Sequence, residues 1–233
     1  MVAAPPQDHR PRGILSVVRR ASSDAAAEFE TFIKITADGS VTAFNGHVDL
    51  GTGIRTALAQ IVAEELDVSF ARVVVVLGDT SSVPDQGPTI ASETIQITAV
   101  PLRQAAAQAR HFLLQRAAER LELRAAELRI EDGLIRGHNR SLSYGELIGD
   151  EIIHLELDEA VQVKAACSYT IVGQSVPRVD IPAKATGEVV FVHDMRIPGM
   201  LHGRVVRPPY AGVDAGNFVG SSLLEVDESS ADS

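Results

Sequence analysis

The sequence predicts an α+β fold. Short apolar runs near 28–45 indicate a hairpin of two strands, and apolar residues at helical spacing follow at 54–66. A longer helical repeat runs from about 94 to 121, and a second hairpin with an Asp-Gly turn follows at 128–136. Because strands and helices are mixed along 28–150, we expect this stretch to form one α+β domain.

The composition indicates a globular protein whose main partner is not nucleic acid. The chain has 233 residues, of which 45% are hydrophobic and 22% are charged, and its formal net charge is −10. The single cysteine, Cys167, excludes an internal disulfide and any all-cysteine metal or iron–sulfur site within this chain. It is compatible with a cytoplasmic location. No apolar run approaches the ~20 residues that a transmembrane helix needs.

The individual elements are expected in a fixed order. These are strands at 32–35 and 41–44 with a turn at 37–40, a glycine loop at 46–53, a helix at 54–66, a strand at 72–79, a loop at 80–88, a helix to about 121, a hairpin at 128–136 and a short helix at 143–148. The β-branched run at 72–79 is typical of a strand buried on both faces. Pro101 either begins the long helix or kinks a helix begun near Thr94, and we favour the kinked longer helix.

The chain is divided by changes in composition. We expect an N-terminal arm at 1–27, the α+β domain at 28–150, a linker at 151–177 and a second unit at 178–233 that ends in an acidic tail. Further strands are expected at 161–164, 189–192 and 200–207. A unit of only ~55 residues would be marginal alone. This predicts a truncated chain, or a subunit that shares its second domain with another polypeptide.

The stretch from Gly46 to Thr56, between a strand and a helix, is the first candidate site. Its glycines let backbone N–H groups approach a ligand closely, and the helix N-terminus after it adds partial positive charge. Both features suit a phosphate or another anion. A tight connection between a strand and a helix needs the same glycines, so a purely structural turn explains the pattern equally well.

Ser92 and Thr94, where a loop meets a helix, are the second candidate site. Their hydroxyls either cap the helix or, with nearby N–H groups, bind a phosphate, and the sequence favours neither interpretation. Together with the glycine loop, they predict an anionic ligand held at two loop–helix junctions.

No residue stands out as a catalytic group or a metal ligand. His47 and Asp49 could share one face of a strand, but no third or fourth ligand is spaced near them. Glu64 and Glu65 are expected on the solvated face of their helix. Cys167 has no adjacent His or basic cluster, and the sequence contains no Gly-x-Ser-x-Gly, Gly-x-Gly-x-x-Gly or Walker motif.

Eight segments carry a resemblance to a known family. They are Ile35–Gly39, Gly46–Leu58, Ala63–Leu66, Pro84–Gly87, Thr89–Thr94, Leu102–Ala106, Val176–Gly187 and, together with Asp194, Pro198–Pro209. In this order they resemble the molybdenum-cofactor-binding subunits of the xanthine oxidase family. They look most like the branch that contains nicotinate dehydrogenase, isoquinoline 1-oxidoreductase and related aldehyde dehydrogenases. The resemblance implies a molybdopterin-binding-type α+β domain followed by the start of an a/b-hammerhead domain.

The resemblance also implies a cofactor, a reaction and partners. It assigns Gly51, Thr52, Gly53, Ser92 and Thr94 to the binding of the pyranopterin and its phosphates. The implied cofactor is molybdenum-molybdopterin in its cytosine dinucleotide form. The implied reaction is hydroxylation of an N-heteroaromatic such as nicotinate, or of an aldehyde, with oxygen derived from water. The implied partners are a second large molybdenum-binding polypeptide and a subunit with [2Fe-2S] clusters.

Three departures from the family pattern bear on what this chain does alone. Thr52 stands where the family usually has Gln, and its shorter side chain cannot make the same amide contact. Pro101 interrupts the helix after the second junction. The glycine-rich motif with the family's catalytic Glu is absent, so this chain alone should be inactive. We expect a component of a molybdenum hydroxylase; the alternatives are a non-catalytic scaffold or assembly subunit, and a stand-alone anion-binding protein.

Overall fold

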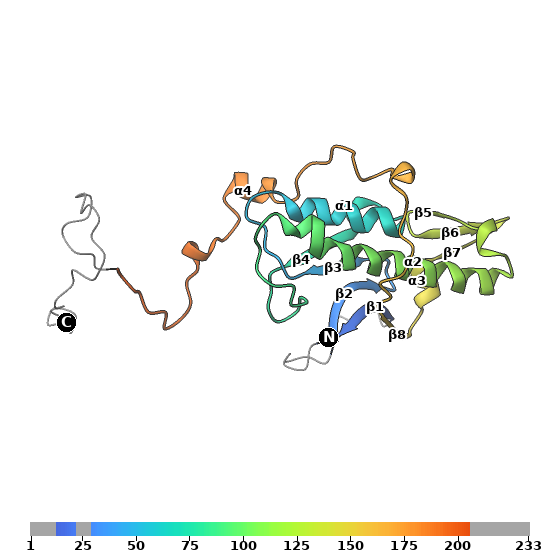
Figure 1. The fold of residues 1–233 in the computed structure, drawn as a ribbon, viewed down its shortest axis with the longest axis horizontal. Helices are drawn as coiled ribbons and strands as arrows, with labels where there is room; N and C mark the ends of the chain where they lie inside the picture. Colours follow the sequence, from blue (N-terminus) through green and yellow to red (C-terminus); the bar gives the residue numbers. More distant parts are fainter. Residues whose placement is uncertain (1–12, 22–28, 206–233) are drawn as a thin grey trace, which may run out of the picture. The chain divides into compact units, whose positions relative to one another are not determined.

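The computed structural model describes residues 13–21 and 29–205 (Figure 1). The chain divides into two compact units, Met1–Ala185 and Thr186–Ser233. The first unit contains every strand among the described residues. Within the same residues, no helix combines the length and apolarity that crossing a bilayer requires.

The first unit is built on a five-stranded mixed sheet. Its strands are β1 (Ile14–Arg20), β2 (Phe29–Thr36), β3 (Val41–Asn45), β4 (Val73–Leu77) and β8 (Ile152–Glu156). The spatial order is β4-β3-β2-β1-β8. The pairs β1–β2 and β2–β3 are antiparallel, whereas β3–β4 and β1–β8 are parallel. The predicted hairpin of β2 and β3, with its turn at 37–40, is confirmed.

Two long helices pack against this sheet and against each other (Figure 1). They are α1 (Ile54–Leu66) and α2 (Ala99–Leu121). The core between sheet and helices includes Leu15, Val17, Phe32, Ile33, Ile35, Leu58, Val62, Leu66, Leu102, Leu113 and Leu147. The mixed sheet with its helices confirms the predicted α+β class.

A π-helical segment, Thr94–Thr98, leads directly into α2. The predicted helical start near Thr94 is therefore confirmed, as a π-helical segment, whereas Pro101 lies in the first turn of the α-helix, the other alternative, and does not interrupt it. Pro101 is tolerated because it lies in the first turn of α2, where backbone N–H groups have no α-helical partner within the helix.

A small antiparallel sheet and a short helix extend the first unit. Its strands are β5 (Arg129–Glu131), β6 (Leu134–Gly137) and β7 (Arg140–Ser143), followed by α3 (Tyr144–Ile148). Asp132 and Gly133 both have positive φ, as a two-residue hairpin turn requires, so the predicted hairpin is confirmed. The strand β7 was not predicted. Single turns of 3-10 helix lie at Phe70–Arg72, Ala125–Glu127 and Ala166–Ser168.

The prediction of an N-terminal arm at 1–27 is wrong for the residues that form β1. This strand is interior to the sheet, with β2 on one side and β8 on the other. Leu15 and Val17 are fully buried. No local pattern indicates this position, because the parallel partner of Ile14 is Ile152, far along the chain. The rest of the expected arm lies outside the described residues, except Gly13 and Ala21.

The strand at 72–79 was expected to be buried on both faces, and that expectation is wrong. β4 forms one edge of the sheet. Val73 and Val75 face the core, but Val74 on the opposite face is 62% exposed. A run of β-branched residues therefore predicts the strand correctly. It does not predict whether both faces are buried, because that depends on whether another element covers the outer face.

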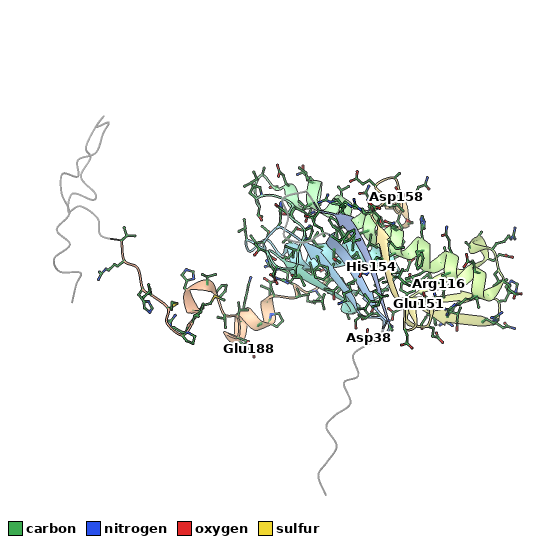
Figure 2. The ribbon with its side chains drawn as sticks, turned by 90° about the horizontal axis from the view of Figure 1, so that it is seen from below. Asp38, Arg116, Glu151, His154, Asp158 and Glu188 are labelled. Carbon is green, nitrogen blue, oxygen red and sulfur yellow. The ribbon has the colours of Figure 1, made fainter. Side chains whose placement is uncertain are left out.

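The linker expected at 151–177 contains β8 and then an extended segment, residues 157–180, which we call the strap. The strap crosses α1 and α2 (gold to orange in Figure 1). Its start is fixed by Gln108 of α2, which donates to the Glu156 carbonyl at 2.7 Å and accepts from the Asp158 N–H at 3.0 Å. Arg116 of α2 pairs with Glu151, just before β8 (Figure 2).

The strand expected at 161–164 is absent, since this part of the strap is bonded to side chains instead of to another strand. The Lys164 N–H donates to the Glu65 carboxylate at 3.1 Å. The helix α4 (Ile181–Thr186) follows the strap. The segment expected to be a passive linker is therefore a bonded part of the first unit.

The described part of the second unit, residues 186–205, has one short helical turn, Val192–Asp194. The strands expected at 189–192 and 200–207 are wrong within these residues; positions 206 and 207 and the acidic tail lie outside them. A strand needs a backbone partner, and the described residues of this unit offer none. Val192 and Leu201 are 83% and 94% exposed.

Candidate functional site

The glycine loop is shaped by its own aspartate. The carboxylate of Asp49 accepts backbone N–H groups from Gly51 at 2.9 Å, Gly53 at 3.2 Å and Arg55 at 3.3 Å. Partial burial would raise the pKa of Asp49, but these hydrogen bonds outweigh it and lower the pKa below its ordinary value. Gly51 (φ 98°) and Gly53 (φ 79°) are both left-handed. The turn therefore needs glycine at both positions.

The second junction contains two consecutive strained residues. Ala91 (φ 49°) and Ser92 (φ 59°) both adopt the left-handed region, which residues other than glycine rarely occupy. They are followed by Glu93, the N-cap residue of the π-helical segment that begins at Thr94. The sequence left open whether Ser92 or Thr94 caps this helix through its hydroxyl. Neither does, because the N-cap residue is Glu93 and no side chain makes a cap hydrogen bond there. Strain of this kind is often stored at ligand-binding sites.

The two junctions are joined by side-chain hydrogen bonds. These are Asn45 Nδ2 to the Thr98 carbonyl (3.1 Å), Gly46 N–H to Gln86 Oε1 (2.8 Å), His47 Nδ1 with Thr94 Oγ1 (2.8 Å) and Val48 N–H to Thr89 Oγ1 (3.0 Å). Segments about forty to fifty residues apart in sequence therefore lie side by side.

A hollow of about 370 Å³ lies between the two junctions. Its lining residues are Val48, Leu50, Thr52, Ile54, Thr89, Ile90, Ala91, Ser92, Thr94 and Ile95. Three of the five predicted site residues, Thr52, Ser92 and Thr94, therefore share one cavity. Gly51 and Gly53 do not line it; they form the turn that carries Thr52.

His47 is completely buried, and its Nε2 atom has no hydrogen-bond partner among the described residues. Its Nδ1 atom contacts Thr94, while the Asp49 carboxylate is bonded to the loop N–H groups. The two side chains thus do not form a metal pair. No group of three or more His, Cys, Asp or Glu residues that could hold a metal occurs in the described parts of the chain.

Glu64 and Glu65 are not on a solvated face, so that prediction was wrong. Both are buried, with relative exposures of 2% and 1%. Glu64 Oε2 accepts three consecutive N–H groups of the strap, from residues 170–172, and Glu65 accepts from Arg103 at 2.7 Å. The two residues anchor the strap. Their position between the apolar pair at 62–63 and Leu66 is the signal in the sequence that could have revealed their burial.

The strap carries Arg178 to the glycine loop, a contact that the sequence analysis did not foresee. Its Nη1 donates to the Gly51 carbonyl at 3.1 Å. A Cβ on Gly53 would lie 3.0 Å from Arg178 Nε. Asp180 holds the guanidinium by two hydrogen bonds, at 3.0 and 2.7 Å. The loop is therefore supported from outside as well as by Asp49.

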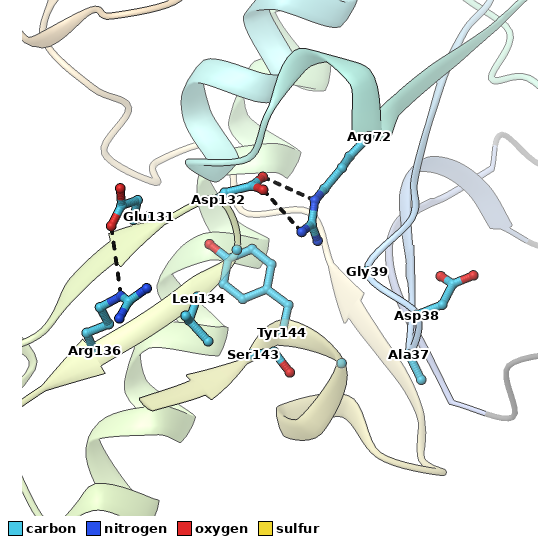
Figure 3. Close-up of a pocket in the computed structure, with 12 residues that line it drawn as sticks. Ala37, Asp38, Gly39, Arg72, Glu131, Asp132, Leu134, Arg136, Ser143 and Tyr144 are labelled. Atoms are coloured by element: carbon cyan, nitrogen blue, oxygen red, sulfur yellow. Dashed lines mark hydrogen bonds and ion pairs between the residues drawn. The ribbon is translucent and has the colours of Figure 1, made fainter. Parts of the chain in front are cut away.

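A second hollow, of about 400 Å³, lies beside the small sheet (Figure 3). Four of its five charged side chains pair with one another: Arg72 contacts Asp132 at 3.1 Å, and Arg136 contacts Glu131 at 3.8 Å (Figure 3). The fifth, Asp38, accepts hydrogen bonds from Thr36 and Ser40. This leaves little unpaired charge to select a ligand, and we do not assign it as a functional site. Cys167 is exposed on the strap.

Comparison with known proteins identifies the family. The model of the molybdopterin cofactor-binding domain matches residues 4–193. The chain belongs to this family. In this member of the molybdopterin cofactor-binding domain family, the glycine loop and the second loop–helix junction lie around one hollow.

Individual relatives agree with the family. The chain is 56% identical to a nicotinate dehydrogenase subunit from Pseudomonas putida, over 97% of this chain and 19% of that protein. It is 32% identical to the beta subunit of isoquinoline 1-oxidoreductase from Brevundimonas diminuta, over 82% of this chain and 30% of that protein. The chain thus spans less than a third of the length of either relative. The resemblance predicted from the sequence is confirmed.

Among solved structures, CO dehydrogenase from Oligotropha carboxidovorans matches with a TM-score of 0.45 and 23% identity. The match covers 58% of this chain and 18% of that chain.

Proposed function

We propose that this chain forms part of the molybdopterin-binding site of a molybdenum hydroxylase. The observation that carries the proposal is the hollow that brings Thr52, Ser92 and Thr94 together in a chain of the molybdopterin cofactor-binding domain family. The hydroxylation itself, its substrate and the partner subunits belong to the larger assembly of which this chain is a part.

The donor set of the hollow fits such a cofactor. Hydroxyl groups on its wall can donate to phosphate or other anionic oxygens, while Val48, Leu50 and Ile90 offer an apolar surface for a ring system. His47 is linked to this wall by the hydrogen bond between its Nδ1 and Thr94, and its buried Nε2 has no partner among the described residues. The space where a Cβ of Gly51 would lie is open, with no atom within 4 Å, so a ligand can approach the Gly51 backbone from that side.

The proposed role of the residues in this chain is to bind and orient the cofactor. Thr52 and Ser92 would hold the cofactor from opposite junctions, Thr94 would donate from the helix start, and the glycine turn would keep Thr52 in place. When bound, the cofactor would supply the redox chemistry of hydroxylation with oxygen derived from water. We propose the cytosine dinucleotide form, a partner subunit with [2Fe-2S] clusters, a second large molybdenum-binding polypeptide and a cytoplasmic location.

The proposed substrate is an N-heteroaromatic such as nicotinate, with an aldehyde as the second class. The names of two relatives support this order, since the nicotinate dehydrogenase subunit is 56% identical and the isoquinoline 1-oxidoreductase subunit is 32% identical. This chain has no glycine-rich motif with a catalytic Glu. The proposed base therefore comes from another part of the assembly.

The test is metal analysis of the complex purified through this chain, combined with native mass spectrometry. Molybdenum and iron in the wild-type complex, with additional subunits, are expected. Ser92→Ala should lower the molybdenum content, whereas Ser141→Ala, the same change at an exposed position of β7, should not. A wild-type complex without molybdenum would refute the proposal.

A scaffold role is the second candidate, and Thr52 is the observation that favours it. Thr52 stands where the family usually has a longer amide side chain, so the loop of this chain reaches less far into the hollow. If Thr52→Gln raised molybdenum retention without changing assembly, Thr52 would be a weak ligand in a working site. If Thr52→Gln and Thr52→Ala both left molybdenum retention and activity unchanged, the scaffold role would be favoured.

A further inference from the structure

The side chain of His47 has an unusual environment. It is 0% exposed, and its ring has one hydrogen bond among the described residues, between Nδ1 and Thr94 Oγ1 at 2.8 Å. The other ring nitrogen, Nε2, has no partner there. Buried polar atoms are normally hydrogen-bonded, so an exception in a native fold calls for an explanation.

Two neutral tautomers of His47 are possible, and they differ in what they leave unsatisfied. With the proton on Nε2, Thr94 donates to Nδ1 and a buried N–H has no acceptor. With the proton on Nδ1, His47 donates to Thr94 Oγ1 and only a lone pair on Nε2 is unpaired. Because orphaned buried N–H groups are rarer than orphaned acceptors, we assign the proton to Nδ1.

This assignment determines what Thr94 can do. Its oxygen accepts from His47, so its own hydroxyl proton remains available. Among the described residues, Thr94 Oγ1 has no hydrogen bond other than that to His47. Thr94 is 8% exposed and is one of the residues that line the hollow. An acceptor atom of a ligand in the hollow would complete the chain from His47 through Thr94.

We propose that His47 is a positioning residue that presents the Thr94 hydroxyl as a hydrogen-bond donor to an anionic oxygen of the ligand. This inference rests on the proposed function, because that ligand is the molybdopterin cofactor. His47 does not line the hollow and acts only through Thr94.

A purely structural role explains the same features less well. The backbone of His47 is held without its ring, since its N–H donates to Asn45 Oδ1 at 3.1 Å. The two junctions are also joined through Gln86 and Thr89. A leucine at position 47 would fill much of the volume and leave no unpaired nitrogen. For stability alone, an apolar residue would therefore serve as well.

The experiment compares His47→Leu, Thr94→Val and the double variant in the complex purified through this chain. Two quantities are measured: the rate at which molybdenum is lost on dialysis, and the melting temperature of the isolated chain. Each single variant is expected to lose molybdenum about tenfold faster, the effect of one hydrogen bond to a charged group. The double variant is expected to lose it no faster than the Thr94→Val variant, since His47 acts only through the Thr94 hydroxyl, which that variant already lacks.

His47→Asn serves as the conservative variant, because its Nδ2 is attached where Nδ1 is in histidine and can donate to Thr94. It should restore most of the molybdenum retention. The melting temperature of the double variant should equal or exceed that of the wild type, since it replaces a buried polar pair with apolar groups. A fall of several degrees in the double variant would show that the pair is structural and would overturn the inference.

The outcomes also separate this inference from the function on which it rests. If the wild-type complex carries no molybdenum, the proposed function fails, and the inference fails with it. If the wild type retains molybdenum and the His47→Leu variant retains it equally well, only the inference fails. Additive losses in the double variant would likewise show that His47 does not act through Thr94.

Discussion

Replacing Glu64 with glutamine should loosen residues 170–172 of the strap from α1. The carboxylate Oε2 accepts the N–H groups of Thr170 at 2.9 Å, Ile171 at 2.6 Å and Val172 at 2.9 Å, and Lys164 Nζ lies 3.5 Å from Oε1. The Glu64 side chain is only 2% exposed, so these bonds are protected from water. One buried charge therefore holds three consecutive residues of the strap.

The expected size follows from these bonds. A hydrogen bond to a charged group contributes about 1 kcal/mol more than a neutral one, so losing the charge at three bonds should cost about 3 kcal/mol. This agrees with the ~3–5 kcal/mol for removing one member of a buried ion pair. The melting temperature should fall by about 6–12 °C. Hydrogen exchange at the amides of residues 170–172 should quicken about a hundredfold.

The assay is thermal melting together with hydrogen exchange, with Glu119→Gln as the control, because Glu119 is an exposed residue of α2. Burial would raise the pKa of Glu64, but the N–H groups of the strap, led by Ile171, and the charge of Lys164 lower it below the ordinary 4.5. The stabilisation is therefore complete above the unfolded-state pKa and is lost as the pH falls through the folded-state value. If Glu64→Gln melted like Glu119→Gln, with unchanged exchange at 170–172, the account would be wrong.

Three further changes test the loop and a helix cap. Asp49→Asn should destabilise the chain by about 1 kcal/mol at pH 7. Because folding lowers the pKa of Asp49, the melting curves of wild type and variant should converge as the pH falls through the folded-state pKa. Gly53→Ala should cost about 1–2 kcal/mol more than Gly51→Ala in chemical denaturation, since both positions have positive φ but only Gly53 lies against the Arg178 side chain; equal losses would contradict this. Ser143→Ala should cost about 1 kcal/mol, because Ser143 accepts the N–H of the third residue of α3, and an unchanged melting temperature would show that the cap is dispensable.

Local patterns predicted the local structure of this chain well. The spacing of Ile54, Leu58, Ile61 and Val62 predicted α1 to its last residue, and the Asp-Gly pair predicted the β5–β6 turn. These features depend on neighbours within a few residues, which the sequence displays directly.

Long-range structure was not predictable in the same way. The position of β1 inside the sheet depends on β8, and the burial of Glu64 depends on N–H groups more than a hundred residues away. The apolar neighbours of Glu64 and Glu65 could have indicated that this part of the helix is covered, but nothing near them shows that a later segment will supply the hydrogen-bond donors.

The candidate site shows both cases. Thr52, Ser92 and Thr94 were singled out from local motifs, and the fold brings them to one hollow. For His47, sequence patterns indicated nothing beyond a weak metal pair, because its burial and its bond to Thr94 arise only when the two junctions meet. Arg178 was missed for the same reason.

The parallel pairing of β1 with β8 has a consequence for synthesis on the ribosome. Ile14 is among the first described residues to emerge, whereas its partner Ile152 emerges only after both long helices have been made. Until then, one edge of β1 in the nascent chain has no strand beside it and is open to pairing with other chains. We expect a chaperone that shields strand edges to bind the growing polypeptide, and to leave once residues 152–156 have cleared the exit tunnel.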